Sequence, residues 1–279
     1  MVRIVRTPIL ALALCLSSAP VFAQTNLAGS WAARNHQEQV IRGGAGPMVV
    51  DYTGLPLNDE GRARALAWSP SEISALERQC TGYPQPYIAV GPFGLRIWEE
   101  TDTATGASIA WKVGAWEDRA TMTIWMDGRP HPSPNAPHDH EGFTTGVWTG
   151  ERLTAYTTHM RAGYMRRNGA PLSDRATLTV HFLPHGDLLT LVAITEDPVY
   201  LSEPHIETKS YIRDGSVMPT VGPPCVPGFE GAVTEVPHFL PGRNPYVSEL
   251  TEKFGVPADA ALGHAETLYP DYRSKMGRK

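Results

Sequence analysis

A histidine followed by a polar loop rich in arginine and tyrosine is the feature of this sequence best suited to acid–base chemistry. His159 ends a β-rich run, and Arg161, Tyr164 and Arg166 follow within a few residues. A histidine titrates near neutral pH, a guanidinium can hold a carboxylate, and a phenol can deliver a proton. We therefore expect His159 and Tyr164 to be catalytic and Arg161 or Arg166 to bind an anionic substrate. The alternative is a structural histidine, hydrogen-bonded at the end of a strand.

Four further residues are candidates for the same site. His181 and Glu196 lie on two β-rich runs joined by a hairpin over residues 184–187, and a shared face would let them support catalysis. Whether they share that face depends on the strand register, because a slip of one residue inverts it. The structural alternative is that Glu196 only ends a strand, since Asp197-Pro198 follows it. Trp148 and Tyr156, also on predicted strands, are the candidates for binding the apolar part of a substrate.

A proline-spaced loop carries a second group of titratable side chains, His131, His138, Asp139, His140 and Glu141. Two histidines two residues apart on an extended loop can bind zinc if a third ligand joins them. The sequence has no H-E-x-x-H motif, so we predict a solvated loop and no metal site, with a metal-dependent hydrolase kept as an alternative. It also lacks a G-x-S-x-G elbow, a phosphate-binding loop and a dinucleotide fingerprint, and we therefore expect no organic cofactor.

The elements that must position these side chains are short strands. Nine runs of β-branched and aromatic residues are candidates: 87–90, 95–99, 108–113, 121–126, 143–148, 152–159, 176–183, 188–195 and 207–213. Consecutive short strands with local turns predict an all-β fold, a lipocalin-like antiparallel barrel of about eight to nine strands. A barrel of this size is filled by side chains or holds one small ligand. We expect His159 at the mouth of such a cavity.

The segments that flank the barrel differ in composition. Residues 24–84 form a lead-in, in which Leu27–Trp31 is similar to the short first strand of small barrels, where a glycine lets a tryptophan plug one end. Two short helices follow, the first capped by Asn58 and the second opened by Ser69-Pro70. The barrel is assigned to residues 85–215. The proline-rich residues 216–279 are predicted to wrap around it, with short helices over 247–254 and 258–266.

The first 23 residues have the features of a secretory signal peptide. Arg3 and Arg6 precede a short apolar run, Ile9–Leu16, and an A-x-A-like end follows at Ala23. The apolar run is too short to span a bilayer. We expect cleavage after Ala23 and a periplasmic or secreted protein.

Export determines how the cysteines are interpreted. Of three cysteines, Cys15 leaves with the signal peptide, and Cys80 and Cys225 remain. Two thiols in an oxidising compartment usually pair. A Cys80–Cys225 disulfide would close a long loop and contribute about 4–5 kcal/mol in the chain-entropy model. A nucleophilic or metal-binding cysteine is the alternative.

Charge and length limit the classes of partner. The net charge is −5, both signs are mixed along the chain, and no long basic run occurs. Nucleic acid and anionic membranes are therefore excluded as expected partners, which leaves a small molecule. The 279 residues allow one large β domain or two small ones. The sequence does not determine the oligomeric state.

Several short motifs in the middle of the chain point to a family. They are W-M-D-G-R-P-H-P (125–132), G-V-W-T-G-E-R-L (146–153), T-T (157–158), S-D (173–174) and E-D-P (196–198). In order and spacing they resemble a group of exported, mostly uncharacterised bacterial proteins with the pattern MDGR-HP … G-WEGD-L … TT … EDP. That resemblance covers roughly residues 57–213 and implies a lipocalin-like β-barrel. His159 departs from the pattern, since a glycine usually follows the double threonine.

Some exported proteins that this chain resembles accompany the breakdown of lignin-derived aromatic acids, including decarboxylation without a cofactor. The resemblance and the residues together lead to one main hypothesis: an exported, cofactor-independent lyase that acts on a small aromatic acid by His/Tyr acid–base chemistry. A non-catalytic protein that binds a hydrophobic small molecule is the first alternative, and the metal-dependent hydrolase is the second.

Overall fold

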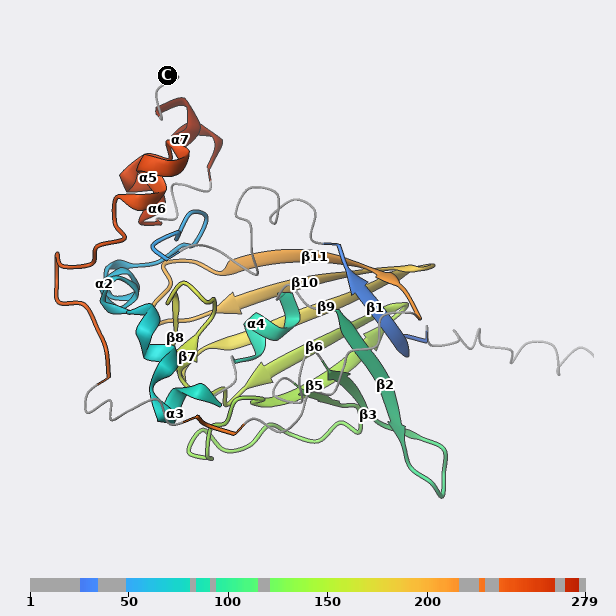
Figure 1. Ribbon diagram of the computed structural model, residues 1–279. Coiled ribbons are helices and arrows are strands. Elements are labelled where there is room, and N and C mark those ends of the chain that lie inside the picture. Colours follow the sequence, from blue (N-terminus) through green and yellow to red (C-terminus); the bar gives the residue numbers. More distant parts are fainter. Residues whose placement is uncertain are drawn as a thin grey trace, which may run out of the picture.

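The fold is a closed β-barrel of nine strands (Figure 1). The computed structural model describes residues 26–34, 49–80, 84–90, 94–114, 121–215, 226–228, 236–263 and 269–275. In barrel order the strands are β1 (Gly29–Ala33), β11 (His205–Arg213), β10 (Leu188–Glu196), β9 (Thr177–His185), β6 (Arg152–Thr158), β5 (Phe143–Thr149), β4 (Thr121–Trp125), β3 (Ser108–Gly114) and β2 (Leu95–Thr101). The prediction of an all-β, lipocalin-like barrel is confirmed.

Alternation along the strands decides which side chains fill the barrel. On β9, Leu178, Val180 and Phe182 are buried, whereas Thr179 and His181 between them are only partly covered. The same alternation recurs on β6 and β10. Because successive side chains of a strand point to opposite faces, the buried set lines the inside of the barrel and forms its apolar core.

The first strand closes the barrel with a tryptophan. Trp31 is completely buried, and its indole N–H donates to the carbonyl oxygen of Leu27 at 3.0 Å. The guanidinium of Arg213 lies 4.3 Å from the centre of the Trp31 ring, and β1 pairs with both β11 and β2. The sequence interpretation of this segment is confirmed. The boundary set at residue 85 leaves β1 outside the barrel to which it belongs.

Two features depart from the predicted antiparallel meander. β4 and β5 pair in parallel, because the long connection over residues 126–142 turns the chain back so that β5 starts beside the last residues of β4 and runs in the same direction. The run predicted as a strand at 87–90 belongs instead to helix α4 (Gln85–Val90), which packs against β9, β10 and β11. A short apolar run does not distinguish a buried strand from a buried helix, and here the helix forms.

Short helical elements gather at one end of the barrel (Figure 1). They are α2 (Asp59–Ala67), the 3₁₀ helix η1 (Pro70–Ser74) and α3 (Leu76–Gln79), next to the small ribbon of β7 (Gly163–Tyr164) and β8 (Pro171–Leu172). The side chain of Asn58 accepts a hydrogen bond from the N–H of Gly61 at 2.8 Å, which confirms the predicted helix cap. These elements cover the end at which β6 and β10 finish and β11 begins.

The C-terminal segment contacts the N-terminal helices. Its helices are α5 (Glu249–Phe254), α6 (Ala258–Ala261) and α7 (Pro270–Lys275), of which the last is absent from the sequence prediction. The side chain of Asn244 donates to the carbonyl oxygen of Leu66, and Phe239 N–H donates to Ala67. Among the described residues, none of the helices is long and apolar enough to cross a membrane.

Two predictions fall outside the described residues: the signal peptide over residues 1–23 and the position of Cys225. A pair of hydrogen bonds joins Gln79, the residue before Cys80, to Gly228. The side-chain amide of Gln79 donates to the carbonyl oxygen of Gly228 at 2.9 Å and accepts from its N–H at 2.7 Å. The Cys80–Cys225 disulfide remains a prediction.

Candidate functional site

Strand β11 carries a row of polar side chains on the inner side of the barrel. His205, Glu207, Lys209 and Tyr211 alternate with outward side chains such as Ile206, which is 60% exposed. Their neighbours on the inner face of β10 include Ala193, opposite Glu207. Polar groups inside an otherwise apolar barrel cost free energy unless they are paired, so this row requires an explanation.

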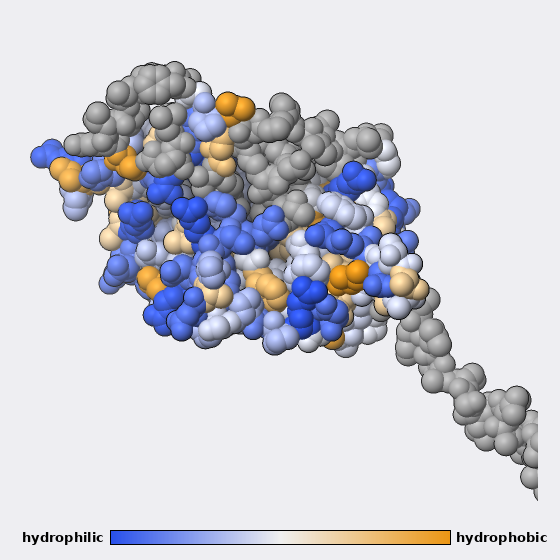
Figure 2. All heavy atoms as spheres, turned by 90° about the horizontal axis from the view of Figure 1, so that it is seen from below, coloured by the Kyte–Doolittle hydropathy of each residue, from blue (hydrophilic) through white to orange (hydrophobic). Residues whose placement is uncertain are grey.

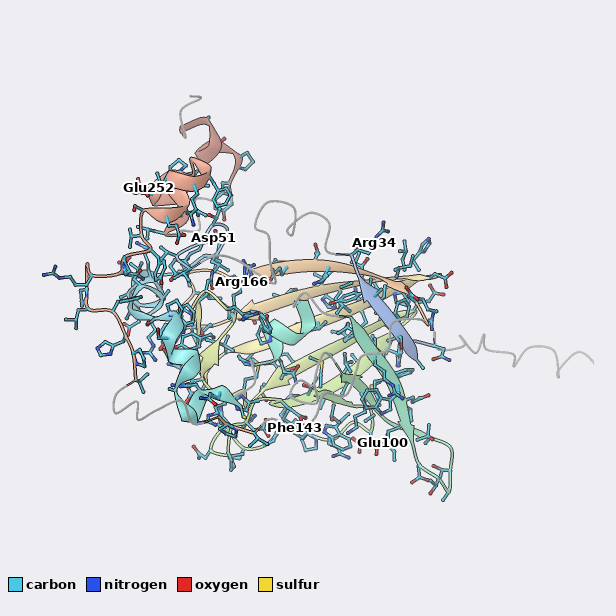
Figure 3. The ribbon with its side chains drawn as sticks, in the orientation of Figure 1. Arg34, Asp51, Glu100, Phe143, Arg166 and Glu252 are labelled. Carbon is cyan, nitrogen blue, oxygen red and sulfur yellow. The ribbon has the colours of Figure 1, made fainter. Side chains whose placement is uncertain are left out.

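A residue from the loop after β7 pairs with this row. The guanidinium of Arg166 donates to Glu207 Oε1 at 2.7 Å and lies 3.4 Å from His205 Nε2. Figure 3 shows Arg166 at the helical end of the barrel. The side chains of Arg166 and Glu207 are 17% and 25% exposed, respectively. Both side chains are therefore partly accessible to water.

The electrostatics of the row favour a charged carboxylate at Glu207. Burial alone raises the pKa of Glu207, but attraction to Arg166 and the hydrogen bond from His205 lower it to about 2. Burial raises the pKa of Tyr211, and the negative charge of Glu207 raises it further. At neutral pH the row therefore holds a Glu207 carboxylate and a neutral Tyr211 phenol.

His205 can serve either as an acid or as a base in this arrangement. Its Nε2 lies 3.3 Å from Glu207 Oε2 and 3.4 Å from the Arg166 guanidinium. A protonated Nε2 can donate to Glu207, whereas an unprotonated one can accept from Arg166, and a single ring nitrogen cannot do both. Both protonation states thus have a partner in place, as a group that moves a proton requires.

Three buried polar side chains inside the barrel region lack a partner among the described residues. Both amide atoms of Gln85, on α4, are unpaired, and so are the indole N–H groups of Trp111 and Trp148. Trp111 and Trp148 pack edge to face with ring centres 6.2 Å apart. An unpaired buried polar group costs about 1–3 kcal/mol, so each of these groups offers a hydrogen bond to a water or a ligand.

His159 faces the outer side of the barrel wall. Its predecessor on β6, Thr158, continues the outward set that alternates with buried Leu153, Ala155 and Thr157. His159 leaves the strand with φ of +58°, and its ring contacts Thr158 Oγ1 at 2.7 Å and the Ser133 carbonyl oxygen at 2.9 Å. The strand register of β6 thus places His159 on the outer wall and not at the mouth of an inner cavity, where the sequence had led us to expect it.

The other residues predicted around His159 are separated from it. The hydroxyl of Tyr164 donates to the buried carboxylate of Glu72 at 2.9 Å, and burial with the Glu72 charge raises its pKa to about 12. Arg161 is exposed, and its N–H donates to the carbonyl oxygen of Asp139. Tyr164 thus has a structural partner, and Arg166 belongs to the inner row.

His181 and Glu196 lie on the outer face without meeting. The Nδ1 of His181 lies 2.9 Å from the Thr154 hydroxyl. Glu196 is exposed and pairs with Thr177, four residues along β9 from His181. That spacing corresponds to roughly 13 Å along the strand, too far for a shared hydrogen bond.

The two predicted substrate-binding aromatics lie on opposite sides of the wall. Trp148 is partly buried and packs on the core from inside, whereas Tyr156 faces outward and is 41% exposed. Tyr156 contacts the ring of His131, with centres 5.3 Å apart. Only Trp148 can contribute to a site inside the barrel.

In the loop over residues 131–141, the ring of His131 is held by protein partners. Within the described residues, no group of three or more His, Cys, Asp and Glu side chains is arranged to hold a metal ion. His131 instead hydrogen-bonds through both ring nitrogens, to Thr158 at 2.7 Å and to Thr145 at 2.8 Å. This arrangement disfavours the metal-dependent hydrolase.

Sequence reasoning missed His205 and Glu207. Both fall on or beside a run that was correctly predicted as a strand, and their alternation with Ile206 and Thr208 is visible in the sequence. Taken alone, that alternation is typical of a solvent-facing polar side. The signal that was available is the length of the polar row, H-x-E-x-K-x-Y, on a strand that must close a barrel.

Comparison with known proteins adds no assignment. No family model matches the chain, and no curated protein or solved structure matches it.

Proposed function

We propose that this protein is an exported, cofactor-independent enzyme that acts on a small acid with an apolar body at the inner row of β11. A lyase step of the decarboxylation type is the most concrete form. One observation supports the proposal above others: Arg166, His205 and Glu207 form a contiguous acid–base group on the inner side of the barrel, partly open to water.

The charges of the row suit an anionic substrate. Among Arg166, His205, Glu207 and Lys209, two permanent cations accompany one carboxylate. A guanidinium that already donates one hydrogen bond to Glu207 has further N–H groups to offer. Because charge-assisted hydrogen bonds are strong in a partly buried site, a substrate carboxylate is expected beside Arg166 and Lys209.

His205 would carry the proton in the chemical step. The protonated ring gives its proton to the substrate carbon that bears the carboxylate. The bond between that carbon and the carboxylate carbon breaks, and carbon dioxide leaves. The electron pair of the broken bond forms the new C–H bond, and water reprotonates His205. Glu207 stabilises the charged ring, as a carboxylate partner of a catalytic histidine does.

The apolar body of the substrate would face the inner aliphatic side chains and Trp148. Its unpaired indole N–H offers a hydrogen bond to a polar ring substituent, as on a phenolic acid. In the strand register, Leu178 and Val180 lie level with His205 and Glu207, and Phe182 lies level with Trp148. A substrate that contacts both Arg166 and Trp148 therefore lies along these buried side chains.

The test is turnover of small aromatic acids. Purified protein is incubated with a panel of benzoic and cinnamic acids, and mass spectrometry follows the loss of carbon dioxide. The proposal predicts product with the wild type and a loss of about 10²-fold or more in His205→Asn. Unchanged turnover in His205→Asn would overturn the assignment. Thr208→Val, on the outward face of the same strand, is the matched control.

A non-catalytic binding protein is the second candidate. The polar atoms of Gln85, Trp111 and Trp148, which are buried without a partner among the described residues, would support it by pairing with a bound ligand. A binder would show a ligand-dependent rise in melting temperature without product. The same incubation, followed by thermal unfolding, separates the two candidates.

A further inference from the structure

The outer wall of the barrel carries a second group of side chains that the inner row does not involve. Thr158 Oγ1 lies 2.7 Å from Nδ1 of His131 and 2.7 Å from Nδ1 of His159. His159 Nε2 lies 2.9 Å from the Ser133 carbonyl oxygen, and His131 Nε2 lies 2.8 Å from the Thr145 hydroxyl. A hydroxyl between two imidazoles, each held at its far nitrogen, is an arrangement suited to nucleophilic chemistry.

The partners fix the direction of each hydrogen bond. A carbonyl oxygen can only accept, so His159 Nε2 must carry a proton, and the neutral ring then has its lone pair at Nδ1. The Thr158 hydroxyl therefore donates to His159 Nδ1 and accepts from His131 Nδ1–H. In neutral His131, Nε2 accepts from the Thr145 hydroxyl. This assignment follows from the network and leaves His159 as the base of the Thr158 hydroxyl.

The contact between Thr158 and His159 depends on an uncommon backbone conformation. Successive residues of a strand point to opposite faces, so neighbouring side chains do not normally meet. His159 adopts φ of +58°, which turns its ring back onto the hydroxyl of the preceding residue. Non-glycine residues seldom adopt this conformation, and such residues cluster at functional sites.

The surroundings of Thr158 are partly apolar and partly open. Tyr156, two residues before it on the same face of β6, is 41% exposed. The His131 ring packs on Phe143, with centres 5.2 Å apart, and on Tyr156. Figure 3 places Phe143 at the edge of the barrel, away from Arg166. The face in Figure 2 is mostly hydrophilic with isolated hydrophobic side chains.

We infer that Thr158, His159 and His131 form a second reactive site, distinct from the inner row, that hydrolyses small aryl esters. Thr158 Oγ1 attacks the ester carbonyl carbon, and its proton passes to His159 Nδ1. The bond from that carbon to the aryl oxygen breaks, and the leaving phenol takes the proton from His159. Water, activated by the same ring, then releases the acid and restores Thr158. His131 Nδ1–H is the donor nearest to the developing negative charge, and Tyr156 packs on the aryl group.

A second threonine–histidine pair on the same wall supplies the matched control. Thr154 Oγ1 and His181 Nδ1 are 2.9 Å apart and join the neighbouring strands β6 and β9 on the outer face. Within the described ranges, no second imidazole contacts the Thr154 hydroxyl and no carbonyl oxygen accepts from the far nitrogen of the His181 ring. If the network around Thr158 is what activates the hydroxyl, only Thr158 reacts.

The experiment uses p-nitrophenyl acetate as the probe. Purified protein is mixed with the ester, nitrophenolate release is followed by absorbance, and peptide mass spectrometry after an acid quench locates the acetyl group. The inference predicts an acetyl group on Thr158 and a loss of about 10²-fold in rate for Thr158→Val and for His159→Gln. Thr158→Ser keeps the activity, and Thr154→Val leaves it unchanged.

Three results would overturn the inference: acetylation on lysine or histidine without Thr158, an unchanged rate in Thr158→Val, or equal losses in Thr158→Val and Thr154→Val. Circular dichroism checks that each variant folds. If Thr158→Val fails to fold, the site of acetylation in the wild type and the rate of His159→Gln decide whether the inference holds. Because His205→Asn leaves this site intact, esterase activity in that variant separates this inference from the proposed function.

Discussion

The guanidinium of Arg166 lies 2.7 Å from the carboxylate of Glu207, which links the loop after β7 to the inner face of β11. Neither side chain is fully buried, at 17% and 25% exposed. The pair therefore has two proposed roles. Arg166 and Glu207 neutralise each other's charge at the end of the barrel. Arg166, with His205 beside it, also forms part of the proposed substrate site.

Removing the negative charge of this pair is expected to destabilise the fold. In Glu207→Gln the guanidinium of Arg166 stays largely buried without its carboxylate, which costs about 3 kcal/mol. Urea unfolding followed by tryptophan fluorescence measures the change. Glu196→Gln, at the exposed end of β10, is the control and should unfold like the wild type. Equal stabilities of Glu207→Gln and the wild type would contradict the pairing.

The same carboxylate predicts a pH dependence of stability. Its pKa is about 2 in the folded protein, below the ordinary value of 4.5, so the folded state holds fewer protons than the unfolded one. The contribution is fully present above pH 4.5 and is lost as the pH falls through 4.5 towards 2, about 3 kcal/mol in all. The difference in unfolding free energy between wild type and Glu207→Gln should shrink over this window. A difference in unfolding free energy that does not change with pH would exclude the lowered pKa of Glu207.

Tyr164 is expected to stabilise the fold and not to carry a proton in catalysis. Its phenol donates to Glu72, whose carboxylate is buried, and its pKa is raised to about 12. Tyr164→Phe leaves that carboxylate with one partner fewer and should cost about 1–3 kcal/mol. Turnover should stay unchanged under conditions where the variant is folded. A loss of turnover without a loss of stability would restore the catalytic role expected from the sequence.

The inner wall at strand β5 has no room for an added methyl group at Gly146. A Cβ there would lie 2.5 Å from Ile124 and 2.8 Å from the Met126 sulfur. Gly146→Ala should therefore destabilise the protein by about 1–3 kcal/mol through overpacking. Gly215→Ala, where a Cβ meets nothing within 4 Å, is the matched control for thermal unfolding. Equal melting temperatures for the two variants would mean that the wall relaxes freely.

Much of the barrel could be predicted because a strand reveals its two faces in the sequence. Leu178, Val180 and Phe182 alternate with polar residues and are indeed buried together. The tryptophan of the first strand was likewise identified by the glycine before it. Tyr87–Val90 failed because four apolar residues carry no period. The parallel pairing of β4 and β5 depends on where a long loop returns, which no local pattern encodes.

The candidate site was harder to predict for a physical reason. His159 was assigned to the barrel mouth from its position at a strand end, but the outward register of Thr158 and the turn of the backbone carry it to the outer wall. Arg166 was identified, yet its partners Glu207 and His205 lie about forty residues away and meet it only through the closed barrel. Long-range contacts of this kind follow from topology and not from spacing.

Whether the inner row holds a carboxylate can be measured by the binding of an aromatic acid. Isothermal titration of benzoate and of a phenolic acid is compared between wild type, Lys209→Met and Thr208→Val. We expect binding to the wild type and to Thr208→Val, with affinity lower by about tenfold or more in Lys209→Met, since a charge-assisted hydrogen bond is worth at least about 1.4 kcal/mol. Equal affinities in all three proteins, or no binding to the wild type, would contradict a carboxylate site inside the barrel.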